Sequence, residues 1–201
     1  MALDQQKLYT GLTEAFDKGI ETIPVSGSAG QTESKYSKGE IAGFIADAIV
    51  DYASDAEILL LPGPLMIPAP TPVPDVANLG SVLKAQTFDI GKPLLKASIE
   101  ASFTTKDPVM SLITTGVVSY IATSFTVFTG FPGNTATGTT LPVITPVLAP
   151  CTALGMAGSE QDKIIDLMAF IIHTAFKSSV FNGSAVSVFG GIGPIIAQPL
   201  L

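Results

Sequence analysis

The chain has 201 residues, of which 47% are hydrophobic and 13% are charged, and its mean hydropathy is +0.49. All ten basic residues are lysines, and the net charge at pH 7 is −7. Phosphate backbones are bound by clustered Lys and Arg, and bases are most often read by Arg, so this composition argues against a nucleic-acid-binding protein.

A single cysteine, Cys151, excludes an intrachain disulfide and a cysteine-rich metal site. We expect it to be a small buried hydrophobic residue. The first four residues, Met1 to Asp4, have neither the basic region nor the apolar region of a secretory signal peptide, so no signal peptide is predicted.

The first predicted element is a helix from Gln5 to about Ile20. Asp4 is its expected N-cap, and Leu3 and Leu8 have the spacing of a hydrophobic staple. Residues 25–34 are rich in Gly, Ser and Thr, which predicts a flexible loop.

A second predicted helix begins at Ser37, which forms an S-x-x-E capping box with Glu40. Asp47, Asp51 and Asp55 recur every four residues along it. Three carboxylates in a row could bind a cation, but cation sites usually add loop carbonyl oxygens, so a solvated helix face is favoured. The apolar face consists of Ile41, Phe44, Ile45, Ala48, Ile49, Tyr52 and Ala56.

The run Ile58–Leu61 predicts a short buried strand, and residues 62–74 then contain six prolines. Helices and central strands are excluded there, so we expect an extended, polyproline-like arm. This arm would lie against the protein's own surface or a neighbour's. The alternative is a PxxP ligand for a partner domain.

The stretch from Pro108 to Ser159 has no charged residue. A helix at about 93–103 precedes it, and a second helix is predicted from Asp107 to about Tyr120. β-branched or aromatic residues then alternate over 121–131, which predicts a strand. Residues 133–158 are rich in Gly, Thr and Pro and are predicted to form a second extended arm.

The last predicted helix is capped by Ser159 and covers about 164–175. It contains the only histidine, His173, for which we expect a structural role because no catalytic or ligand partners lie near it in sequence. Residues 185–189 are predicted to form a final strand, ended by Gly190 to Pro194. The fold class predicted is therefore α+β, a helical body with short strands and long Pro/Gly-rich extended arms.

An internal helix–strand–arm repeat is also predicted, within a single structural domain over 1–201. Its units cover about 5–80, 92–156 and 159–201, and Tyr120 of the second unit matches Tyr52 of the first. The positions that recur are apolar, which favours a structural role over a catalytic one.

No motif assigns a catalytic, cofactor-binding or metal-binding residue. The Gly-rich run at 190–193 is not followed by Lys-Ser/Thr, and no G-x-S-x-G sequence is present. We therefore do not expect an enzyme or a cofactor. Two alternatives stay open. One is a small membrane protein with a span near 109–131. The other is a small-molecule-binding domain that uses His173, Cys151 and the aspartate stripe, by which we mean Asp47, Asp51 and Asp55.

The helix IAGFIADAIVDY (41–52), followed by a short apolar strand and tracts such as TGFPGNTATGTTLPVITP (129–146), resembles the organisation of small virion structural proteins of tailed bacteriophages. The resemblance implies a capsid, neck, tail or baseplate component without catalysis. It implies a homo-oligomer whose partners are copies of itself and other structural proteins. It also implies location in the virion, after assembly in the host cytoplasm, and contributes no site residues.

Overall fold

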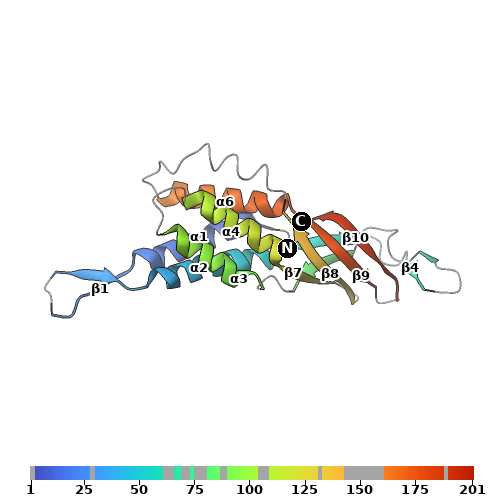
Figure 1. Cartoon of the computed structure of the whole chain (residues 1–201), viewed down its shortest axis with the longest axis horizontal. Helices are drawn as coiled ribbons and strands as arrows, with labels where there is room; N and C mark the ends of the chain where they lie inside the picture. The colour runs from blue at the N-terminus through green and yellow to red at the C-terminus, as the bar shows by residue number, and fades with distance from the viewer. Residues whose placement is uncertain are drawn as a thin grey trace.

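The molecule is elongated, with helices gathered toward one end and a large antiparallel sheet toward the other (Figure 1). This arrangement confirms the α+β class predicted from the sequence. The computed structural model describes residues 3–27, 30–60, 66–68, 73–74, 81–86, 90–103, 109–130, 133–142, 161–187 and 190–201.

The first two helices begin at the predicted caps. The N–H of Gln6 donates to the carboxylate of Asp4 at 2.9 Å at the start of α1, Gln5–Ile20. The Ser37 N–H donates to the Glu40 carboxylate at 2.8 Å, which completes the capping box of α2, Lys38–Ala53. This hydrogen bond lowers the pKa of Glu40. Local sequence therefore fixes both helix starts.

Five helices in the described residues form a closed ring in which each packs on the next. Helix α1 packs on α2, α2 on α3, α3 on α4, and α4 on α6. The ring closes where α6 packs on α1. The remaining bounds are α3, Lys92–Ser102; α4, Val109–Thr123; and α6, Gln161–Lys177.

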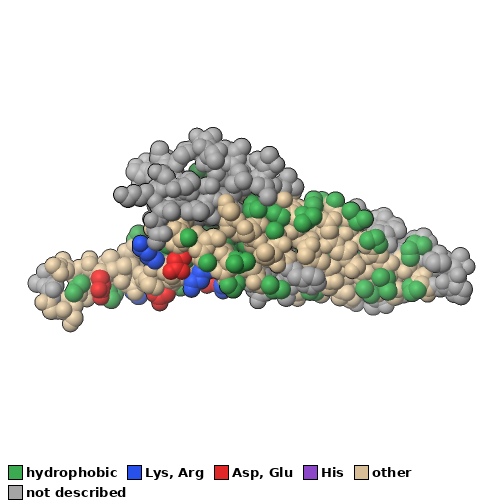
Figure 2. Space-filling view, in the orientation of Figure 1, with side chains coloured by type: hydrophobic (Ala, Val, Ile, Leu, Met, Phe, Trp, Pro, Cys, Tyr) green, Lys and Arg blue, Asp and Glu red, His purple; other side chains and the backbone are tan. Residues whose placement is uncertain are grey.

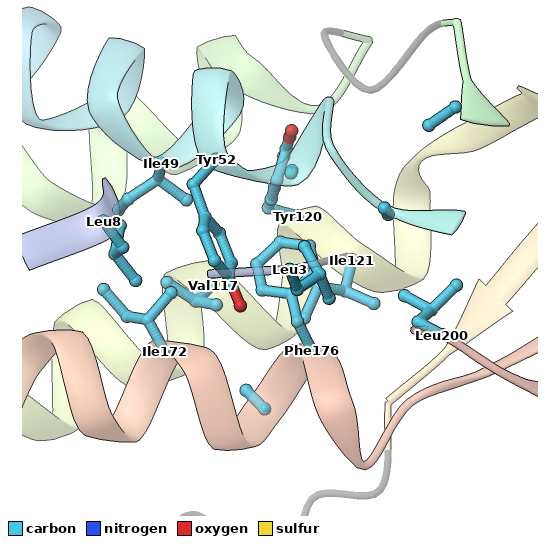
Figure 3. Packing of buried hydrophobic residues seen from close by; sticks show 14 of the residues in the cluster. Leu3, Leu8, Ile49, Tyr52, Val117, Tyr120, Ile121, Ile172, Phe176 and Leu200 are labelled. Carbon is cyan, nitrogen blue, oxygen red and sulfur yellow. The ribbon is translucent and has the colours of Figure 1, made fainter. Parts of the chain in front are cut away.

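Three aromatic side chains meet inside this ring (Figure 3). Phe176 of α6 makes edge-on contacts with Tyr52 of α2 at 5.4 Å and with Tyr120 of α4 at 6.3 Å between ring centroids. All three are fully buried, so each contributes both its apolar area and a favourable ring geometry. Leucine and isoleucine side chains from the same helices surround them, namely Leu8, Ile49, Ile121 and Ile172.

In the part of the chain that the structure describes, the large sheet has eight strands in the order β3-β6-β7-β8-β9-β10-β4-β5, and all pairs are antiparallel. Phe128 of β7 and Phe181 of β9 make an edge-on contact on its inner face, with ring centroids 5.0 Å apart. The same face also buries the polar side chains of Thr126, Asn134 and Thr140. The strands are β3, Glu57–Leu60; β4, Met66–Ile67; β5, Val73–Pro74; β6, Ser81–Ala85; β7, Phe125–Gly130; β8, Asn134–Leu141; β9, Val180–Val186; and β10, Ile192–Pro199.

The sheet curls so that the chain just after β10 reaches back to β3. The Leu201 N–H donates to the Glu57 carbonyl at 2.9 Å, and the Leu3 N–H donates to the Leu201 carbonyl at 3.0 Å. These bonds join both ends of the described chain to the boundary between helices and sheet, where Leu3 and Leu200 are buried (Figure 3).

A second, two-stranded sheet projects from the helical end (Figure 1). It pairs β1, Thr22–Pro24, with β2, Thr32–Ser34, so the loop predicted at 25–34 is wrong in its last residues. An ion pair of 2.6 Å between Lys35 and Glu21 closes the base of this hairpin and raises the pKa of Lys35. The strands are short and lack an apolar face, which is why their sequence gives no strand signal.

Other strand predictions also need correction. Helix α4 continues to Thr123, so the strand expected from Ile121 begins at Phe125. Residues 134–141 form β8 rather than an extended arm. Strand β9 begins at Val180 rather than at 185. A further strand, β10, begins at Ile192 and contains Gly193 and Pro194, which were expected to end the last strand.

Much of the two predicted arms lies outside the described residues. Within 62–74, the described residues include the two-residue strands β4 and β5, which lie at the end of the sheet where proline is tolerated. Helices α2, α4 and α6 each lead almost directly into a strand of an antiparallel pair: β3 with β6, β7 with β8, and β9 with β10. The repeat in the sequence stays a prediction, and this element order is the kind that it would produce.

Candidate functional site

His173, a candidate for chemistry in the sequence, is held by one tyrosine inside the helical ring. The Tyr52 hydroxyl lies 2.7 Å from Nδ1 of His173. Burial lowers the pKa of His173, and the positive charge of Lys177 lowers it further. The negative charge of Asp4 raises this pKa, but its effect is smaller. Burial also raises the pKa of Tyr52. A lowered pKa favours the neutral imidazole of His173, whose Nδ1 can accept a hydrogen bond from the Tyr52 hydroxyl.

This pair links α2 to α6 and has the properties of a structural hydrogen bond. Tyr52 is fully buried and its ring packs on Phe176, so its hydroxyl faces His173 rather than open solvent. Burying a hydroxyl is costly unless it finds a partner, and His173 supplies one. The arrangement agrees with the structural role predicted for this histidine.

Two of the three aspartates in the stripe, Asp47 and Asp55, form ion pairs with lysines from neighbouring helices. Lys92 of α3 forms an ion pair with Asp47, and Lys7 of α1 forms one with Asp55. The ammonium of Lys7 also donates to the backbone carbonyl of Asp51 at 3.1 Å. Through these contacts the aspartates join α2 and the turn that follows it to α1 and α3.

A shallow groove of about 140 Å³ runs along α1 and α2 beside this stripe. Pockets for small molecules usually measure ~300–1,000 Å³, so the groove is small for a ligand site. Within the described ranges, no three His, Cys, Asp or Glu side chains are placed to hold a metal ion. Cys151 lies outside those ranges. The groove is lined by Gly11, Glu14, Ala15, Lys18, Phe44, Asp47, Ala48 and Asp51.

The most unusual surface is on the sheet. Strands β7 to β10 contain no charged residue, and their outward side chains form a continuous neutral surface. Register places Thr129, Thr135, Val186 and Ile192 in one row across the four strands. We call this surface the outer face: Val127, Thr129, Thr135, Thr137, Thr139, Asn182, Ser184, Val186, Ile192 and Pro194.

Large apolar side chains on the outer face are open to solvent. Val186 is 44% exposed and Ile192 is 55% exposed, and Thr135, Thr137 and Thr139 of β8 are exposed between them and β7. Figure 2 shows the contrast: Lys, Asp and Glu side chains gather over the helical end, while the sheet end shows hydrophobic and uncharged groups. On the face that Figure 2 shows, the charged side chains are therefore concentrated over the helices.

Sequence reasoning missed this surface because it assigned residues 133–158 to an arm. The signal was present in Thr135, Thr137 and Thr139, which alternate with buried Ala136 as in a half-buried strand. Gly138 interrupts the pattern, and the many prolines after it favour an arm instead.

The stretch 109–131, which the membrane alternative would use as a span, is divided between two kinds of structure. Helix α4 ends at Thr123 and strand β7 starts at Phe125. Among the helices that the structure describes, none combines the length and the apolar character needed to cross a bilayer. Comparison with protein-family models, with curated proteins and with solved structures finds no match to this chain.

Proposed function

We propose that the chain is a structural subunit of a large protein assembly, most specifically a component of a virion, and that it performs no catalysis. Its partners would be further copies of itself and other structural proteins of the particle. The observation that carries this proposal is the outer face, an exposed sheet surface without a single charge.

The outer face differs from the surface of a protein that stands alone in water. Exposed strand positions of such proteins usually include charges, which keep the protein soluble and prevent sheets from associating. Here Lys84 on β6, beside Thr129, is the nearest charge in register, and it pairs with Glu57 at 3.6 Å. Threonine and valine suit a strand and can pack against another protein without burying a charge.

The resemblance in organisation to virion structural proteins of tailed bacteriophages supports the more specific part of the proposal. Subunits of such particles are surrounded by neighbours, so a low fraction of charged residues is expected on the surfaces that become covered. The projecting β1–β2 hairpin is also of a kind that needs support, because an isolated two-stranded ribbon is marginally stable in water.

The proposal is tested by the size of the complex that contains the chain in its native source. Extracts are prepared with and without detergent and separated by velocity sedimentation, and the chain is located with an antibody. We expect it in particles much larger than its own 20.7 kDa, at the same position with and without detergent. A free chain near 20.7 kDa would contradict the assembly role, and a fraction released only by detergent would favour the membrane alternative.

A further inference from the structure

We propose that the outer face is a self-docking surface, on which the outer face of a second copy of this chain packs about a two-fold axis. This inference rests on the proposed function and names one of the contacts that such an assembly would use. It commits to one occupant, a second copy, and to one mode, sheet packed on sheet.

The chemistry of the outer face selects a neutral partner. With no charge among its side chains, the face gives an acidic or basic partner nothing to pair with, and such a partner would lose the hydration of its own charges. The outer face of another copy carries the same hydroxyls and aliphatic groups. Two such faces can therefore meet without burying an unpaired charge.

The charge distribution of the whole molecule favours the same choice. Each chain has a net charge of −7, so two copies repel each other in most orientations. On the face drawn in Figure 2, the charged side chains lie over the helices, at the other end of an elongated molecule (Figures 1 and 2). The ion pair of Lys84 with Glu57 lies on β6 and β3, outside the outer face. Contact through the outer faces places neutral surface against neutral surface and leaves the acidic groups in water.

The size of the face predicts how strong the contact is. Four strands at ~4.8 Å spacing and ~26 Å long cover about 500 Å². A standard interface buries ~800 Å² on each partner, so the face supplies somewhat over half of that area. We therefore expect a dimer in reversible equilibrium with monomer, with an affinity that repeated contacts in a particle would raise.

A bulge in β10 adds an apolar side chain beside the face. Ile196 and Ala197 together oppose Asn182, and the Asn182 side-chain oxygen accepts the Ala197 N–H at 2.9 Å. Ile196 is 75% exposed at this bulge. A side chain of this kind at the side of a neutral face is a candidate anchor for the partner.

The test uses the full chain and sedimentation equilibrium over a range of concentrations. One variant carries Thr135→Lys and Thr137→Lys, and a second carries Thr135→Glu and Thr137→Glu. The matched control carries Thr22→Lys and Thr32→Lys, which places the same charges on exposed strand threonines of the hairpin. A third variant, Ile196→Ser, introduces no charge.

We expect wild type and the hairpin control to dimerise equally, and each charged outer-face variant to bind itself at least tenfold more weakly. An equimolar mixture of the lysine and glutamate variants should recover association, because opposite charges then meet across the interface; this recovery also shows that both variants are folded. Ile196→Ser should weaken dimerisation several-fold.

The inference is overturned if wild type stays monomeric, or if it dimerises and the outer-face variants dimerise as well as the hairpin control. It is also overturned if the mixture associates no better than its components. These results leave the proposed function intact when the native chain still sediments in large particles. A native chain found only at low mass would overturn the proposed function, even where the recombinant dimer forms.

Discussion

Gly138 and Gly183 face each other across β8 and β9, where the two strands approach too closely for any side chain. A Cβ on Gly138 would lie 2.1 Å from the carbonyl oxygen of Asn182. A Cβ on Gly183 would lie 2.2 Å from the carbonyl oxygen of Thr137 and 2.9 Å from the ring of Phe181. The pair thus leaves room on the inner face for that ring.

Replacing Gly138 with alanine should destabilise the protein by about 2 kcal/mol or more, because the obstructing atoms belong to the backbone and the strands must separate. Urea unfolding followed by circular dichroism measures the free energy of unfolding. The control is Gly43→Ala in α2, where the added methyl group meets only the end of the Lys96 side chain at 3.9 Å. There the same substitution should stabilise by about 0.5–1 kcal/mol. A Gly138→Ala protein as stable as wild type would contradict the close approach.

Tyr120→Asp should prevent folding. Tyr120 is fully buried against Phe176, and a carboxylate there would be removed from water, at a cost of about 4 kcal/mol or more. The neighbouring variant Ser119→Asp places the same charge on the exposed side of α4 and should stay folded. Soluble yield and thermal unfolding distinguish the two, and a folded Tyr120→Asp protein would show that the core is wrongly assigned.

Stability should fall as the pH decreases below about 6.5, the ordinary pKa of histidine. The pKa of His173 in the folded protein lies below that value, so the unfolded state binds its proton first. The stabilisation is complete above pH 6.5 and is lost as the pH falls toward the folded pKa, at about 1.4 kcal/mol for each unit between the two values. Urea unfolding at pH 7.5, 6.5 and 5.5 measures this loss.

His173→Gln is the control for that experiment, because glutamine also accepts a hydrogen bond from Tyr52 but does not titrate. Its stability should change less than that of wild type between pH 7.5 and 5.5. Since the chain has one histidine, a single imidazole resonance reports the folded pKa directly by NMR. A value at or above 6.5 would refute the linkage.

Ala197→Gly should stabilise the protein by about 0.5–1 kcal/mol. Ala197 has a φ of 51°, a left-handed conformation that costs alanine about 1 kcal/mol and glycine very little. Its N–H bond to Asn182 is kept by the substitution. Thermal unfolding compares this variant with Ala185→Gly, a buried position in regular strand β9, which should be destabilised. If both glycines destabilise alike, the bulge does not strain residue 197.

The helices could be predicted from the sequence because their signals are local. The cap at Asp4 and the capping box of Ser37 and Glu40 determine where α1 and α2 begin, and apolar periodicity determines which side is buried. Tyr52 and Tyr120 were matched as equivalent positions, and in the structure both pack on Phe176.

The strands were harder to predict because their order depends on distant partners. Strand β10 contains Gly193 and Pro194, which usually end strands, yet its pairing with β9 tolerates them. The outer face needed the register of four strands, which joins Thr129 to Ile192 across residues far apart in sequence. The partners of the aspartate stripe, Lys7 and Lys92, likewise come from other helices.

The alternation of helices and strands along the chain also determines the order of folding. Strands β7 and β8 are close in sequence, as are β9 and β10, so each pair can form early as a local hairpin. Strands β6 and β7 are separated by α3 and α4, and β8 and β9 by the stretch that contains α6. Each of these junctions joins residues far apart in sequence, and we expect it to close while the intervening helices pack in the ring. Helical ring and sheet should therefore fold together, as one cooperative unit rather than one after the other.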